Sequence, residues 1–190
     1  MNQMTSAIVV AAGKGKRMGG DSPKQYLPLV NRPILCHTLA AIHSCGMIGR
    51  IILVVPEQDY PFCHENILAP FDLEEKVQLV SGGETRQESV CNGLQSIEEN
   101  NGIVVIHDGV RPFVRPEEIK ECIKSAAEFG ACILGIPVQN TLKQVDAAGH
   151  IKKTTPRNSV WQAQTPQCFQ LSLIKKAHVA AKRDGYSGSD

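Results

Sequence analysis

Short, largely apolar runs alternate with longer amphipathic segments along the first 136 residues. The runs predict strands over residues 7–10, 51–55, 77–80, 103–106 and 131–136. The segments between them predict helices over residues 34–45, 86–97 and 116–129, and a last helix is predicted over residues 172–183. Near-continuous apolar strands that alternate with helices are typical of a parallel sheet covered on both faces. Because crossovers between parallel strands are right-handed, we expect an α/β fold with a doubly wound, mostly parallel, Rossmann-like sheet.

The pattern changes after Pro137. Residues 141–155 alternate irregularly and have no helical face, and Asp146-Ala147-Ala148-Gly149 has the composition of a turn. We therefore expect a β-hairpin arm over about residues 139–157 that projects from the sheet. Val145 and Ile151 are apolar, which favours a partner that covers the arm. No repeat, low-complexity tract or interdomain linker is visible, so residues 1–190 are expected to form one domain.

The most informative polar segment follows the first predicted strand. It is Ala11-Ala12-Gly13-Lys14-Gly15-Lys16-Arg17-Met18-Gly19-Gly20, with Pro23-Lys24-Gln25-Tyr26 close behind. Glycines let backbone N–H groups approach an anion closely, and Lys16, Arg17 and Lys24 add positive charge, so this segment predicts a polyphosphate site. Its spacing differs from both common phosphate loops. The glycines are one residue out of register for a dinucleotide fingerprint, and Arg17 stands where a P-loop needs a hydroxyl residue.

Three further predicted strands end in glycines, charged residues or hydroxyl residues. These segments are Gly82-Gly83-Glu84-Thr85-Arg86 with Ser89, then His107-Asp108-Gly109-Val110-Arg111-Pro112, and finally Pro137-Val138 with Thr141 and Lys143. Ligands of open parallel sheets bind outside the carboxyl ends of the strands, near the topological switch point. We therefore expect these segments to meet at one edge of the sheet, with the Asp108 carboxylate beside a divalent cation and phosphates.

Several of these residues also have structural interpretations. Asp108 could cap a turn, Gly82-Gly83 could be a plain turn, and Ser89 could cap the preceding turn instead of contacting a base. Arg111 could pair with an acidic residue. His107 is expected to pack or form a hydrogen bond instead of binding a metal, since no second His or Cys has ligand spacing.

Composition narrows the possible partners and location. A net charge of +1 with dispersed basic residues argues against binding to nucleic acid. The seven cysteines form no C-x-x-C pair, which favours buried thiols in a reducing compartment over disulfides or a zinc site. With no signal peptide and no apolar run of about 18 residues, we expect a soluble, cytoplasmic protein without a membrane partner.

Five ordered blocks resemble the 2-C-methyl-D-erythritol 4-phosphate cytidylyltransferase family of sugar-phosphate nucleotidyltransferases. The blocks are the glycine-rich segment with Pro23-Lys24-Gln25-Tyr26, Gly82 to Leu94, His107 to Pro112, Pro137-Val138-x-x-Thr141-x-Lys143, and Arg157-x-x-x-Trp161-x-x-Gln164-Thr165-Pro166-Gln167. The resemblance implies a fold of the nucleotide-diphospho-sugar transferase type. It also implies transfer of CMP from CTP to 2-C-methyl-D-erythritol 4-phosphate, giving 4-diphosphocytidyl-2-C-methyl-D-erythritol and pyrophosphate in non-mevalonate isoprenoid biosynthesis.

The same resemblance implies residue roles. Arg17 and Lys24 would be catalytic and stabilise the negative charge of the transition state, and no general base is needed because the acceptor phosphate is already anionic. The implied nucleotide-binding residues are Ala11, Ala12, Gly13, Gly15, Gly83, Glu84, Ser89 and Asp108, with Mg²⁺ at Asp108. The implied acceptor-binding residues are Arg111, Thr141, Arg157 and Thr165. Interlocked hairpin arms in the family imply a homodimer in which Thr141 and Arg157 serve the partner's site.

Two features depart from the family's pattern. Gly109-Val110 stands where the family usually has two alanines, and the larger Val110 leaves acceptor choice open. The sequence also ends at Ser187-Gly188-Ser189-Asp190, before a strand and a further site lysine of the family, so we expect a C-terminal truncation with weak or no activity. The alternatives are a D-ribitol 5-phosphate cytidylyltransferase and a catalytically silent nucleotide-binding module.

Overall fold

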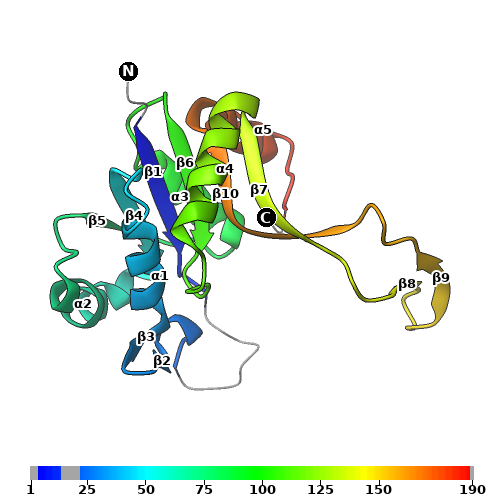
Figure 1. Ribbon diagram of the computed structural model, residues 1–190, viewed down its shortest axis with the longest axis horizontal. Coiled ribbons are helices and arrows are strands. Elements are labelled where there is room, and N and C mark those ends of the chain that lie inside the picture. The colour runs from blue at the N-terminus through cyan, green and yellow to red at the C-terminus, as the bar shows by residue number, and fades with distance from the viewer. Residues whose placement is uncertain (1–3, 14–21, 189–190) are drawn as a thin grey trace.

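A six-stranded sheet forms the centre of the computed structural model, which describes residues 4–13 and 22–188 (Figure 1). Its strands are β1 (Thr5–Val10), β4 (Arg50–Val55), β5 (Val77–Ser81), β6 (Ile103–Asp108), β7 (Ala131–Pro137) and β10 (Trp161–Gln170). The strand order is β5-β4-β1-β6-β10-β7. The strands from β5 to β6 are parallel to one another, whereas β10 is antiparallel to both of its neighbours. The predicted α/β fold with a mostly parallel sheet is therefore confirmed.

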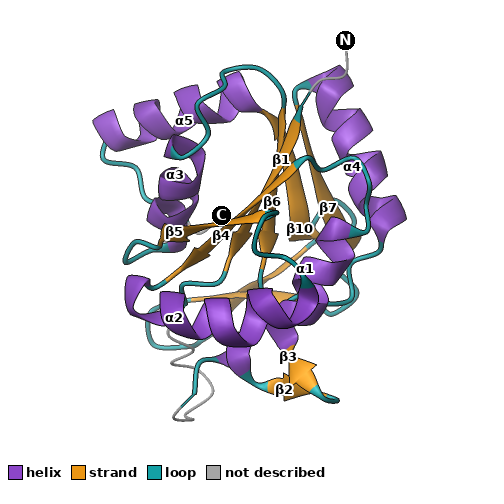
Figure 2. Ribbon diagram, turned by 90° about the vertical axis from the view of Figure 1, so that its left-hand side faces the viewer, coloured by secondary structure: helices purple, strands orange, loops and turns teal. Residues whose placement is uncertain are grey.

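Helices cover both faces of this sheet (Figure 2). They are α1 (Ile34–His43), α3 (Arg86–Gln95), α4 (Pro116–Phe129) and α5 (Leu171–Arg183). Helices α1 and α4 pack on one face in a buried cluster that includes Val9, and α3 and α5 contribute to a second cluster that includes Ile8. Because successive residues of a strand point to opposite faces, a continuous apolar run is needed to supply both clusters.

The helix ends follow from local sequence. Helix α3 begins with a capping box, in which the Glu88 backbone N donates to Thr85 Oγ1 at 3.1 Å and the Thr85 backbone N donates to Glu88 Oε2 at 3.1 Å. Helix α4 begins with Pro116, which needs no N–H partner in the first turn, and is followed by Gly130 at a φ of 90°. These local signals at the helix ends explain why the helix positions could be predicted closely.

Smaller elements complete the fold. They are η2 (Lys24–Tyr26), β2 (Pro28–Leu29), β3 (Arg32–Pro33), η3 (Glu57–Asp59), α2 (Tyr60–Cys63), η4 (His64–Leu68) and η5 (Ala69–Phe71). The apolar pattern predicts none of these short turns and strands, because each is shorter than a periodic pattern can define. Among the described residues, no helix is long and apolar enough to cross a membrane.

Strand β10 is not predicted from the sequence either, although it lies inside the sheet between β6 and β7. Its sequence contains four glutamines and Pro166, which are typical of a loop, and only Thr165 to Cys168 are buried. The prediction of a sheet covered on both faces is wrong at β7. This edge strand is paired on one side only, and Ile133 and Ile136 remain exposed.

The chain between β7 and β10 leaves the sheet and extends away from it (Figure 1). Here β8 (Leu142–Val145) and β9 (Ile151–Thr155) form a two-stranded antiparallel sheet. Val145 and Ile151 pair across the two strands, and their side chains are 51% and 64% exposed. We call residues 139–157 the hairpin segment.

Candidate active site

The carboxyl ends of β1 and β6 lie side by side at the topological switch point of the sheet. Strand β1 is followed by α1 and then β4 on one side, whereas β6 is reached through α3 and pairs with β1 on the other side. Helices α1 and α3 lie on opposite faces of the sheet, so the connections diverge between these two strands (Figure 2). A ligand-binding crevice forms at such a point in open α/β sheets.

Three loops pack closely at this edge because their facing residues are small. A Cβ atom placed on Gly82 would lie 2.2 Å from the Ala12 Cβ, and one placed on Gly109 would lie 2.9 Å from the Ala11 Cβ. Both distances are shorter than side-chain packing tolerates. The loop after β1 is therefore held between the loops that follow β5 and β6, through Ala12 and Ala11.

The segment that carries Lys24 is attached to the same loop. Buried Gln25 donates from Nε2 to the backbone oxygen of Ala11 at 2.7 Å and to that of Gly13 at 3.3 Å. On the other side, the Tyr26 hydroxyl donates to Asp59 Oδ2 at 2.8 Å. Lys24 itself is exposed, and its backbone is fixed beside the loop after β1 by the residue that follows it.

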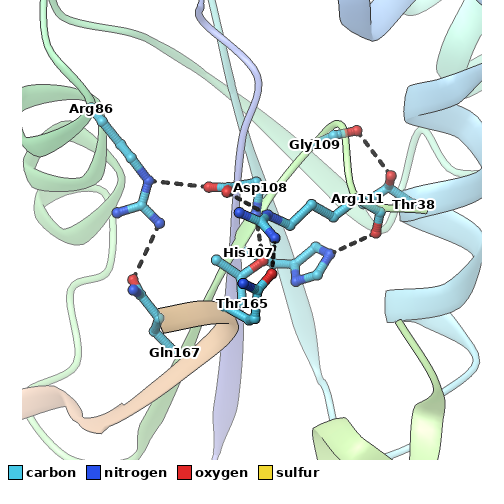
Figure 3. A network of polar contacts seen from close by, with 9 residues as sticks. Thr38, Arg86, His107, Asp108, Gly109, Arg111, Thr165 and Gln167 are labelled. Atoms are coloured by element: carbon cyan, nitrogen blue, oxygen red, sulfur yellow. Dashed lines mark hydrogen bonds and ion pairs between the residues drawn. The ribbon is translucent and has the colours of Figure 1, made fainter. Parts of the chain in front are cut away.

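Asp108 is the centre of a charged cluster at the end of β6 (Figure 3). Its Oδ1 accepts a hydrogen bond from Arg86 Nε at 3.1 Å, and its Oδ2 accepts one from Arg111 Nε at 2.8 Å. The Asp108 side chain is 22% exposed, so water screens these pairs only in part. Arg86 and Arg111 thus place two guanidinium groups at this strand end, and guanidinium groups have the geometry to bind phosphates.

Strand β10 supplies further polar side chains to the Asp108 cluster. Gln167 Oε1 accepts from Arg86 Nη2 at 3.2 Å, and Gln164 Oε1 accepts from Arg111 Nη1. Each arginine is therefore held between Asp108 and a glutamine amide (Figure 3). The predicted site includes none of Arg86, Gln164 and Gln167, although all three stand in the blocks that resemble the family.

Thr165 of β10 also reaches this cluster, but through the backbone. Its Oγ1 accepts from the Asp108 backbone N at 3.3 Å, and Thr165 is buried. Arg111 and Thr165, which are predicted to bind the acceptor, are thus brought together with Asp108, which is predicted to bind the nucleotide. The contact between Arg111 and Asp108 also confirms the expectation that Arg111 could pair with an acid.

Buried His107 fixes the turn that follows β6. Its Nε2 hydrogen-bonds the Arg111 backbone oxygen at 3.0 Å, which requires the proton on Nε2. Desolvation by burial lowers the pKa of His107, so the ring is neutral at physiological pH. Its Nδ1 is buried and has no hydrogen-bond partner among the described residues. The Thr38 hydroxyl donates to the Gly109 backbone oxygen at 2.9 Å and holds the same turn from α1.

Side chains of α3 hold the loop after β5. Ser89 Oγ accepts from the Gly83 backbone N at 3.1 Å and donates to the Thr85 backbone oxygen at 3.0 Å. The Glu84 backbone N donates to Glu88 Oε2 at 2.7 Å. Of the two interpretations left open for Ser89, the structure has the contact that caps the turn. The loop that carries Gly83 and Glu84 is therefore fixed before any ligand binds.

Two predicted acceptor residues lie in the hairpin segment and not in the Asp108 cluster. Thr141 and Arg157 are both exposed, and Arg157 Nη1 donates to the Gln139 backbone oxygen. The hairpin segment extends away from the sheet (Figure 1), so Thr141 and Lys143 do not join the other strand-end loops within one chain. Gly15 and Arg17, two further predicted site residues, lie outside the described residues.

Asp108 is the candidate ligand for a divalent cation. Both of its carboxylate oxygens accept from arginines, so a cation bound there would replace one of these contacts. Within residues 4–13 and 22–188, no group of three or more His, Cys, Asp or Glu side chains could hold a metal ion. Mg²⁺ is often held by one or two carboxylates together with substrate phosphates, and the donors here fit that mode of binding.

Comparisons with known proteins agree with this geometry. The family described as 2-C-methyl-D-erythritol 4-phosphate cytidylyltransferase matches residues 5–190. A protein of that name from Syntrophus aciditrophicus is 43% identical over 190 residues, which are 100% of this chain and 81% of the relative. Another, from Geobacillus kaustophilus, is 44% identical over 185 residues, which are 97% of this chain and 79% of the relative.

A solved structure is similar over the same extent. The 4-diphosphocytidyl-2C-methyl-D-erythritol synthase from Anaerococcus prevotii aligns with a TM-score of 0.84 and 29% identity, covering 100% of this chain and 79% of that chain. The match extends over the sheet, its switch point and the loops that form the Asp108 cluster. The chain therefore belongs to the 2-C-methyl-D-erythritol 4-phosphate cytidylyltransferase family.

Proposed function

We propose that this protein transfers the cytidylyl group of CTP to 2-C-methyl-D-erythritol 4-phosphate and releases pyrophosphate. Family membership supports both the reaction and the acceptor. The structural observation that carries the proposal is the position of the Asp108 cluster. It lies at the switch point beside the loop after β1, where open α/β sheets bind nucleotides, and it contains two guanidinium groups, which suit phosphates.

The reaction needs positioning and charge stabilisation more than proton transfer. An oxygen of the acceptor phosphate attacks the α-phosphorus of CTP, a new P–O bond forms, and the bond to the bridging oxygen breaks as pyrophosphate leaves. Because the acceptor phosphate is already anionic, no side chain has to remove a proton. We assign Lys24 and Arg17 to the negative charge that accumulates in this transition state. The exposed position of Lys24 beside the loop after β1 supports its assignment.

The nucleotide is assigned to the loops after β1 and β5. The backbone of Ala11, Ala12, Gly13 and Gly15 would contact the triphosphate, and that of Gly83 and Glu84 would contact the cytosine. The contact between Ala12 and Gly82 supports this arrangement, because it places the two loops next to each other. Ser89 would act by holding the second loop in shape, which its hydrogen bonds to Gly83 and Thr85 favour.

We assign Mg²⁺ to Asp108 together with phosphate oxygens of CTP. When bound, the ion supplies charge neutralisation to the phosphates. Arg86 and Arg111 hold the Asp108 carboxylate in a fixed orientation. Calorimetry tests this assignment: Mg²⁺ should bind weakly to the free protein and more tightly in the presence of CTP. Asp108→Asn should reduce this difference, and unchanged Mg²⁺ binding by the variant would contradict the assignment.

A homodimer built through the hairpin segment is part of the proposal. A two-stranded hairpin is marginally stable by itself, and exposed Val145 and Ile151 would gain stability from burial against a second copy. In this arrangement, Thr141 and Arg157 of one protomer would bind the acceptor in the site of its partner. Within one chain, β8 and β9 extend away from the sheet (Figure 1), which supports this assignment.

The acceptor can be tested directly. Pyrophosphate release from CTP is measured with 2-C-methyl-D-erythritol 4-phosphate and with D-ribitol 5-phosphate, in single-turnover assays with excess protein so that slow transfer is also detected. We expect a preference for the methylerythritol acceptor of at least ~100-fold in kcat/KM, as for a site that hydrogen-bonds its substrate. The ribitol alternative is not favoured by the relatives described above. Preference for ribitol 5-phosphate would overturn the proposed acceptor.

A substitution at Lys24 separates a catalyst from a silent nucleotide-binding module. Lys24→Ala should lower turnover by ~10²–10³-fold, as expected for loss of a group that stabilises the transition state, while CTP affinity changes much less. Lys124→Ala is the matched control, because Lys124 is an exposed lysine of α4 that pairs with Glu121. CTP binding without turnover in the unsubstituted protein would instead indicate a silent module.

A further inference from the structure

Three cysteines from three elements meet between α4 and the sheet, apart from the charged groups of the candidate site. Cys122 lies in α4, Cys132 in β7 and Cys168 in β10. Cys132 and Cys168 are direct partners in the antiparallel pairing of β7 with β10. The Cα atoms of such partners lie about 4.5–5.5 Å apart, so the two side chains are close neighbours.

Cys122 faces this pair from the helix. Its Sγ lies 3.2 Å from the backbone oxygen of Cys132 and 3.7 Å from the backbone oxygen of Pro166. Hydrogen bonds from the thiols of Cys168 and Cys132 lower the pKa of Cys122, although burial opposes this shift. Burial raises the pKa of Cys132. Cys122 is therefore a buried thiol that faces the cysteines of both strands.

Access to solvent differs among the three thiols. Cys122 is 2% exposed and Cys168 is fully buried, whereas Cys132 is partly exposed on the edge strand β7. A small oxidant that approaches from solvent therefore reaches Cys132 first. The cluster thus combines a sulfur that solvent reaches with a buried thiol in contact with it, which can convert a sulfenic acid into a disulfide.

We propose that Cys122 and Cys132 are a modification site at which hydrogen peroxide forms a disulfide bond between α4 and β7. Peroxide transfers one oxygen to the Cys132 sulfur, which becomes a sulfenic acid, and one water is released. The Cys122 sulfur then attacks the Cys132 sulfur, the S–O bond breaks, and the leaving hydroxide takes the Cys122 proton to give a second water. Overall, two thiols and one peroxide give one disulfide and two waters.

The cysteine pair lies next to the candidate site, and the proposal of a disulfide does not depend on the proposed function. Cys122 contacts the backbone of Pro166, which lies between Thr165 and Gln167. Thr165 bonds the Asp108 backbone, and Gln167 bonds Arg86. A covalent bond at Cys122 would therefore form next to the segment of β10 whose side chains contact the Asp108 cluster.

Peptide mapping tests the proposal on the unsubstituted chain. The protein is treated with hydrogen peroxide, its remaining thiols are alkylated under denaturing conditions, and tryptic peptides are compared with and without reductant. Cleavage after Lys120, Lys124, Lys143, Arg157 and Lys175 places the three cysteines on three different peptides. We expect a linked peptide pair that contains Cys122 and Cys132 and that disappears on reduction.

Partly exposed Cys91 on α3 serves as an internal standard for oxidation. The proposal would be overturned if a dose of peroxide oxidises Cys91 while Cys122 and Cys132 can still be alkylated. A linked peptide pair that contains Cys168 would also overturn it. Cys168→Ser is the matched control, and it should still form the linked pair, whereas Cys122→Ser and Cys132→Ser should not. Because the mapping needs no substitution, its result decides the proposal even if a variant fails to fold.

Discussion

The Asp108 cluster and the hairpin segment are both polar and both lie at the ends of strands, yet they are held in different ways. In the cluster, residues from α3, β6 and β10 bond one another across up to 81 positions of sequence, as Arg86 and Gln167 do. In the hairpin segment, side-chain hydrogen bonds join near neighbours, such as Lys143 with Thr154 and Asp146 with Ala148. The geometry of the cluster is fixed by long-range packing, whereas that of the hairpin is fixed by local pairing.

This difference has a consequence for where a second subunit is needed. The Asp108 cluster has its charged groups paired within one chain, so folding of the sheet is enough to form it. The hairpin segment leaves Val145 and Ile151 exposed, and two strands without a covering layer have little stability. Under the proposed dimer, the first region is complete in a monomer, and the second becomes functional only by association.

The largest effect that separates the two regions is expected from matched Asp-to-Asn substitutions. Asp108→Asn removes the charge that Arg86 and Arg111 share, and we expect turnover to fall by ~10²–10³-fold. Asp146→Asn keeps the acceptor oxygen that binds the Ala148 and His150 backbone N–H groups, so turnover should change less than ~3-fold. Steady-state kinetics measures both. Similar losses in the two variants would remove the distinction between the regions.

A second comparison concerns packing at the strand-end loops. Gly82→Ala would force a Cβ to within 2.2 Å of the Ala12 Cβ, and we expect the free energy of unfolding to fall by ~1–3 kcal/mol. Gly49→Ala is the control, since its Cβ would make an ordinary contact of 3.9 Å with the Thr5 backbone oxygen. Its effect should stay within ~0.5 kcal/mol. Urea denaturation compares the two, and equal stabilities would show that the loops do not pack as tightly as described.

Substitutions in the hairpin segment test dimer formation and leave the hydrophobic core around the sheet unchanged. Replacing Val145 and Ile151 with lysine should raise the dissociation constant of the dimer by at least ~10-fold, because two apolar side chains no longer bury surface. The denaturation midpoint of the monomer should not change, and Gln144→Ser, also exposed in β8, should leave association intact. Sedimentation equilibrium measures the constant. A protein that is monomeric before any substitution would contradict the proposed dimer.

The smallest expected effect is a pH dependence that originates at the turn after β6. Burial lowers the pKa of His107 in the folded state, whereas the unfolded residue titrates near ~6.5. Below that pH the unfolded chain binds a proton that the folded chain does not, so the free energy of unfolding should fall with decreasing pH by up to ~1.4 kcal/mol per unit.

The substitution His107→Gln should remove this contribution, while its side-chain amide can still donate to the Arg111 backbone oxygen. Burial also lowers the pKa of His178, so part of the slope should remain in the His107 variant. Chemical denaturation between pH 5 and pH 7 provides the measurement, and identical slopes for the His107 variant and the unsubstituted protein would refute this origin.

Much of the sheet could be predicted because apolar runs that fill two cores leave a local signal. The strands that became β1, β4 and β6 are buried along most of their length, whereas the edge strand β5 is mostly half-buried. The capping residues of α3 and α4 mark where each helix begins. Strand β10 left no such signal. Two of its four glutamines, Gln164 and Gln167, contact arginines that follow other strands, so their role depends on residues far away in sequence.

By itself, the sequence determined the α/β class, the strand-end loops and the family, because these depend on local periodicity and on ordered motifs. Only the tertiary structure decided that Arg86 and Arg111 share Asp108. The same holds for the contact by which Ser89 holds the Gly83 loop and for the three cysteines that meet between α4 and the sheet. The physical reason is the same in each case. Short-range hydrogen bonds and thiol contacts select their partners by distance in space, which the order of residues along the chain does not specify.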